Sequence, residues 1–72
     1  MNRETAAKIN DLLVQCHAEL HGSIDVARAV CSDEENRMYC KAVGMVLGYM
    51  LLDLMDPIYR EHPALTPDHL RP

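Results

Sequence analysis

Two histidines four residues apart are the side chains in this chain whose spacing best suits chemistry. His17 and His21 fall within a predicted helix, where an i, i+4 pair lies on one face and can chelate a divalent metal. A further ligand is missing, because Cys16 points about 100° away on the helix wheel and no carboxylate completes the group within one chain. We therefore predict no metal site, and keep His17 and His21 as candidates that a second copy would have to complete.

Catalytic motifs are not found in the sequence. There is no Gly-rich phosphate loop and no Ser-His-Asp arrangement, and Ser23 beside His21 is the one serine close to a histidine. We therefore expect a non-enzymatic protein with no catalytic residues and no cofactor. The alternative function is a metal- or redox-responsive helical bundle that uses His17, His21 and a cysteine.

Composition indicates a soluble, folded chain. Its 72 residues are 49% hydrophobic and 25% charged with a net charge of −4, which predicts one domain over 1–72. No segment is basic, so we expect no binding to nucleic acid or to a membrane surface. The three cysteines cannot all pair within one chain, and the polar first residues do not resemble a signal peptide. We therefore predict a cytoplasmic location.

A helix is predicted over 33–56, and the rest of the chain must be arranged around it. Ser32 and Glu35 form a capping-box pattern at its start, and Pro57 should stop or kink it at its end. Its central part is apolar nearly all round, which is typical of a buried helix. The apolar run 42–52 is shorter than the roughly 20 residues of a membrane span, so we interpret it as a core helix.

A second amphipathic helix is predicted over 3–31, with Asn2 as its N-cap. Gly22 lies on its polar side, so we expect the helix to continue through this glycine. The link to the next helix is very short, which predicts an antiparallel helical hairpin. The expected hairpin core comprises Leu13, Cys16, Leu20, Ile24, Ala27, Met38, Met45, Tyr49 and Leu52.

The second apolar side of helix 33–56 is predicted to bind another copy of the chain. So short a chain buries a small core, and dimerisation is a common way to stabilise one. Two hairpins would then form a four-helix bundle, as a homodimer or a larger homo-oligomer. The expected oligomer interface comprises Val43, Val46, Leu47, Met50 and Leu54.

The tail 57–72 contains all four prolines and is expected to form short helical turns. Tyr59, Arg60 and His62 form a polar and aromatic patch on it. This patch either recognises a partner or caps the end of the bundle, and the sequence leaves both interpretations open.

The stretch AVGMVLGYMLLDLMDPIYREHPAL resembles the C-terminal half of short, uncharacterised bacterial proteins with all-helical folds. This resemblance implies no known activity. The function that we predict is a protein-protein interaction or regulatory adaptor module that acts through self-association, with a further protein partner possible. Several methionines on the apolar faces of helix 33–56 suit an adaptable binding surface.

Overall fold

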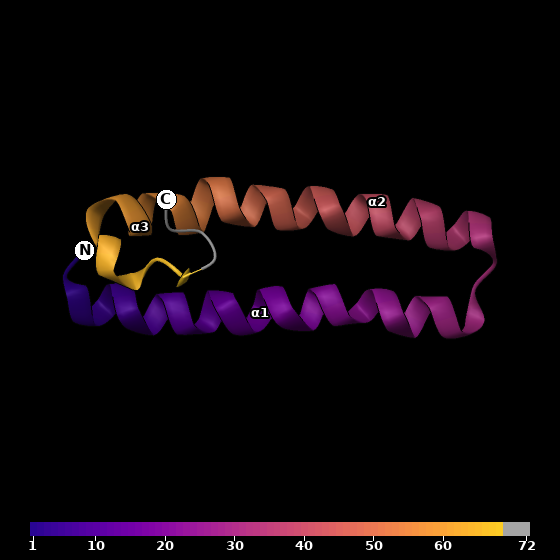
Figure 1. The fold of residues 1–72 in the computed structure, drawn as a ribbon, viewed down its shortest axis with the longest axis horizontal. Coiled ribbons are helices and arrows are strands. Elements are labelled where there is room, and N and C mark those ends of the chain that lie inside the picture. The colour runs from indigo at the N-terminus through magenta and orange to yellow at the C-terminus, as the bar shows by residue number, and fades with distance from the viewer. Residues whose placement is uncertain (69–72) are drawn as a thin grey trace.

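The computed structural model describes residues 1–68, and every regular element in them is helical, so the chain is all-α. Helix α1 spans Arg3–Val30 and α2 spans Asp33–Tyr49. A π-helical segment, η1, follows at Met50–Met55, and α3 at Asp56–Glu61 and the 3₁₀ turn η2 at Pro63–Leu65 complete the order. Figure 1 shows α1 and α2 side by side and antiparallel, with α3 folded near the start of α1. Residues 69–72 of the predicted tail lie outside the described part.

Both long helices begin at the residues that the sequence predicts. The Asn2 side chain accepts a hydrogen bond from the Thr5 amide at 2.8 Å, and α1 runs without interruption through Gly22. The Ser32 hydroxyl accepts from the Glu35 amide while the Glu35 carboxylate accepts from the Ser32 amide. These caps satisfy amide groups that a helix start leaves unpaired, and they confine the link between the helices to two residues.

The helical run does not stop at Pro57, and α3 is one of the short helical turns expected in the tail, with Pro57 in its first turn. Proline has no amide hydrogen and its ring crowds the carbonyl one turn earlier. The chain accommodates it by widening the preceding turn, so that the Asp56 amide donates to the Leu51 carbonyl, five residues back. The wider turn changes which side chains face inward: Met55 is 4% exposed, whereas its neighbour Leu54 is 53% exposed.

The largest buried cluster lies at the end of the molecule where α3 meets the start of α1. Its core consists of Ala6 from α1, Met55 from η1, and Ile58 and Tyr59 from α3. Side chains partly buried against this cluster are Ile9, Leu13, Met50, Leu51 and Leu65. Outside the cluster, Val43 is the one buried side chain among the described residues. The packing is therefore tight at the end of the molecule where α3 meets the start of α1, and sparse toward the turn between α1 and α2.

The structure corrects the predicted orientation of α2. Four residues assigned to the hairpin core from this helix and η1 are more than half exposed: Met38, Met45, Tyr49 and Leu52. Three residues assigned to the oligomer interface are buried or half-buried instead: Val43, Leu47 and Met50. From α1, Cys16 is also exposed, whereas the other expected core residues are half-buried: Leu13, Leu20, Ile24 and Ala27. The helix is apolar on both sides, so its periodicity alone could not determine which side packs on α1.

The deciding residues for this orientation lie beyond Pro57. Ile58 and Tyr59 pack against α1, and the unbroken helical run carries Val43 to the same side of the molecule. A helix that ended at Asp56 would have lacked this anchor. Gly44 and Gly48 do not mediate close packing between α1 and α2. No atom of another element lies within 4 Å of a Cβ built on either glycine.

The run Asp33–Glu61 is also long and apolar enough, by length and composition, to cross a membrane. It contains 29 residues, and its most apolar stretch has a mean hydropathy of 1.4 with 11% of that stretch buried. Signal sequences and the mostly buried core helices of soluble proteins meet the same criteria. In the single chain this stretch is mostly exposed, so it is not the buried core helix that the sequence predicts. This property alone therefore does not place the chain in a membrane.

Candidate interaction surface

The predicted metal candidates lie on α1. His17 is half-buried and His21 is exposed, and no group of three or more His, Cys, Asp or Glu side chains within residues 1–68 could hold a metal ion. Cys16 and Cys40 are exposed and Cys31 is half-buried, all three as free thiols. The metal- or redox-responsive alternative stays a prediction that no contact in the described residues favours.

The three residues of the predicted tail patch do not form one surface. Tyr59 is buried, and its hydroxyl donates to Oδ1 of Asn10 on α1 at 2.7 Å. Burial raises the pKa of this phenol above its ordinary value of 10.0. Arg60 is exposed and pairs with Asp56 at 2.7 Å, whereas His62 turns back toward the chain start. Tyr59 therefore belongs to the core and is not available to recognise a partner.

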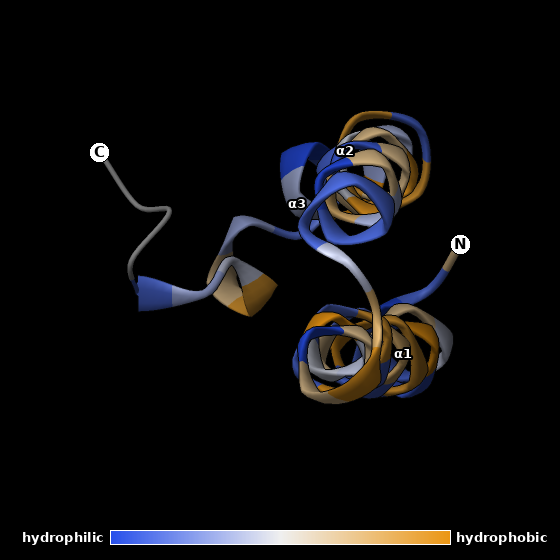
Figure 2. Ribbon diagram, turned by 90° about the vertical axis from the view of Figure 1, so that its right-hand side faces the viewer, coloured by the Kyte–Doolittle hydropathy of each residue, from blue (hydrophilic) through white to orange (hydrophobic). Residues whose placement is uncertain are grey.

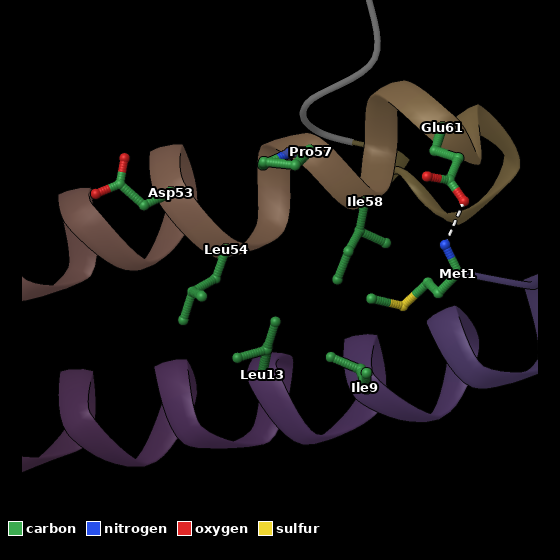
Figure 3. A pocket seen from close by; sticks show the side chains of 8 residues that line it. All are labelled: Met1, Ile9, Leu13, Asp53, Leu54, Pro57, Ile58 and Glu61. Carbon is green, nitrogen blue, oxygen red and sulfur yellow. Dashed lines mark hydrogen bonds and ion pairs between the residues drawn. The ribbon is translucent and has the colours of Figure 1, made fainter.

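The start of the chain is joined to the end of α3 by a small polar cluster. The Met1 ammonium donates to Oε1 of Glu61 at 2.8 Å (Figure 3). The His62 ring lies 3.0 Å from the Met1 carbonyl. The hydrogen bond from this ammonium, followed by its charge, holds the pKa of Glu61 below its ordinary value of 4.5. These contacts hold α3 against the start of α1.

An apolar hollow of ≈ 390 Å³ lies beside this cluster. Its lining is Met1, Ile9, Leu13, Asp53, Leu54, Pro57, Ile58 and Glu61 (Figure 3). In this view the aliphatic side chains of α1 and the opposite helical run point toward one another, and the Asp53 carboxylate points away from α1. A second hollow of ≈ 320 Å³ shares Asp53 and Leu54 with the first and is completed by Val46, Tyr49 and Met50.

The most unusual surface is an apolar one on the side of the helical run away from the core, which we name the outer face of α2. It comprises Met38 (65% exposed), Met45 (58%), Val46 (51%), Tyr49 (66%) and Leu52 (65%). Leu54 is also 53% exposed, but its side chain points toward α1 (Figure 3). Figure 2, which views the helix pair end-on, shows hydrophobic segments on the side of α2 that is turned away from α1. Single exposed apolar residues are common, whereas several large ones on one side of a helix are unusual.

A groove of ≈ 660 Å³ extends this surface across to α1 near the turn. Its lining is Ser23, Val26, Ala27, Val30, Cys31, Glu35, Met38 and Tyr39. The Ser23 and Tyr39 hydroxyls lie 2.8 Å apart and bridge the two helices here. Val26 and Val30 are 70% and 85% exposed. Neither valine was among the predicted site residues, although their position one turn apart on α1 was the available signal.

Comparison with protein-family models, with curated proteins and with solved structures finds no match to this chain. The resemblance of the stretch 42–65 to short bacterial proteins stays a prediction.

Proposed function

We propose that the chain is a non-enzymatic interaction module that works by self-association, in which a second copy covers the outer face of α2. Two such helix pairs would form a four-helix bundle. We further propose that this assembly resides in the cytoplasm and acts there as an adaptor or regulator. The observation that carries the proposal is that five large apolar side chains on the outer face of α2 are more than half exposed.

The area of the chain supports this proposal. Its accessible surface is 5458 Å², whereas a compact monomer of 8.2 kDa is expected to expose about 4500 Å². The excess of roughly 900 Å² is close to the area of about 800 Å² that each partner buries in a standard protein-protein interface. One interface on each chain would thus bring the exposed area to that of a well-packed protein.

The shape of the chain agrees with its area. The radius of gyration is 14.5 Å, whereas about 11 Å is expected for a compact domain of this length. The molecule measures 45 × 19 × 19 Å, so it is a rod one helix pair thick. A second rod laid along the first would shield the apolar side chains of both without any change in either fold.

Methionines suit such a surface because their flexible thioethers adapt to the shape of a partner. Met38 and Met45 occupy the outer face, and both are more than half exposed. A monomer would leave these side chains in water, at a free-energy cost of about 25 cal/mol for each Å² of apolar area that a partner could bury.

The test is the solution mass of two charge-insertion variants. In Met45→Glu, self-association would place a carboxylate in an apolar contact, so we expect a monomer at concentrations where the wild type is a dimer. The matched control is Val14→Glu, which adds the same charge to an apolar position on α1 that is 44% exposed. A wild-type chain that is monomeric at several hundred micromolar would refute the proposal.

A further inference from the structure

One row of side chains on the outer face of α2 has opposite charges at its two ends. Lys41, Met45, Tyr49 and Asp53 follow one another at four-residue spacing, and all four are exposed. Residues four apart form a ridge on a helix surface, and two such ridges can pack against each other. The row spans about 18 Å along the helix axis.

Neither terminal charge of this row is paired within the described part of the chain. Among the ion pairs within residues 1–68, none involves Lys41 or Asp53. The Asp53 carboxylate points away from α1 (Figure 3), although the apolar hollows lie at its base. Both charges are therefore available to a group that approaches the outer face.

We propose that the second copy binds antiparallel to the first, with Lys41 of each chain paired to Asp53 of the other across a two-fold axis. This proposal rests on the proposed self-association and specifies its geometry. By residue count, an antiparallel overlay that places Met45 opposite Tyr49 of the second copy also places Lys41 opposite Asp53, and the step from Tyr49 to Asp53 runs through the wider turn of η1. The row is self-complementary in this orientation, with an apolar centre and an ion pair at each end.

The same alignment yields a second pair of opposite charges. Glu34 then lies opposite Arg60 of the second copy, and both residues are exposed. Arg60 already pairs with Asp56 in its own chain, but a guanidinium has five donors and can bind two carboxylates. A parallel arrangement would instead bring Lys41 against Lys41 and Asp53 against Asp53. Charge complementarity therefore selects the antiparallel orientation.

A charge-swap series tests this arrangement in the full-length chain. Lys41→Glu and Asp53→Lys each replace two attractive contacts of the dimer by two repulsive ones, so each should raise the dimer dissociation constant on the order of tenfold at low salt. The double variant restores opposite charges in the antiparallel register and should return the constant to near the wild-type value. Sedimentation equilibrium measures the constant, and circular dichroism checks that the exposed substitutions leave the helices intact.

The outcomes separate this inference from the proposed function. A dimer that the single variants do not weaken, or that the double variant does not restore, overturns the antiparallel register and leaves self-association standing. A parallel dimer would give the first of these results, because each single variant would exchange one pair of like charges for another. A wild type that stays monomeric refutes the self-association itself, and the register with it.

Discussion

The hydroxyl of Tyr59 donates a hydrogen bond to Oδ1 of Asn10 at 2.7 Å, and this contact joins residues that are 49 positions apart in the chain. It connects α3 to the first third of α1, beside the main buried cluster. The bond exists because the helical run continues past Pro57 and carries Tyr59 inward. It therefore marks the feature that orients the whole of α2.

We expect Tyr59→Phe to lower the free energy of unfolding by about 1 kcal/mol, because a part-buried hydrogen bond is lost while the ring stays in the core. Denaturant unfolding followed by circular dichroism measures this change. Tyr49→Phe is the matched control, since it removes a hydroxyl from a ring that is 66% exposed, and it should change stability little. Equal effects of the two variants would contradict the described position of Tyr59.

Met55 and Leu54 are neighbours that should respond differently to truncation. Met55→Ala should cost about 2–5 kcal/mol of stability, because Met55 is 4% exposed and its loss leaves a cavity. Leu54→Ala should cost less than about 1 kcal/mol when measured at low protein concentration, where self-association does not contribute. A regular α-helix through this segment would place the two side chains differently, so the reverse order of effects would argue against the π-helical turn.

The Glu61 contact with the Met1 ammonium should make stability depend on pH in the acidic range. The pKa of Glu61 is lowered in the folded chain, so its contribution is present above the ordinary value of 4.5 and is lost as the pH falls through the lowered value. We expect stability to fall more steeply between about pH 5 and pH 3 in the wild type than in Glu61→Gln. Glu19→Gln, which removes an exposed carboxylate from α1, should keep the wild-type slope.

Much of the secondary structure follows from local chemistry and could be predicted. Asn2 and the Ser32–Glu35 capping box fix the two helix starts, and the periodicity across Gly22 indicates one continuous helix. All of these signals depend on residues close together in the chain. The all-α class was predictable for the same reason.

The orientation of α2 depends on tertiary packing and could not be predicted from its own residues. Val43 and Met45 are both apolar and lie on different sides of the helix. The sequence pattern therefore does not indicate which of these sides packs on α1. Ile58 and Tyr59 determine which side of α2 packs on α1. Both lie beyond Pro57, and a proline inside a helix usually ends it. The wider turn at η1 then shifts the inward positions by one residue, which no regular helical period reproduces.

The most direct test of self-association is the solution mass of the unmodified, reduced chain, measured by light scattering across a dilution series. We predict a mass near twice 8.2 kDa at high concentration that falls toward 8.2 kDa on dilution. A mass of 8.2 kDa at every concentration up to several hundred micromolar would contradict self-association, because the outer face of α2 would then remain in water without a second copy to cover it.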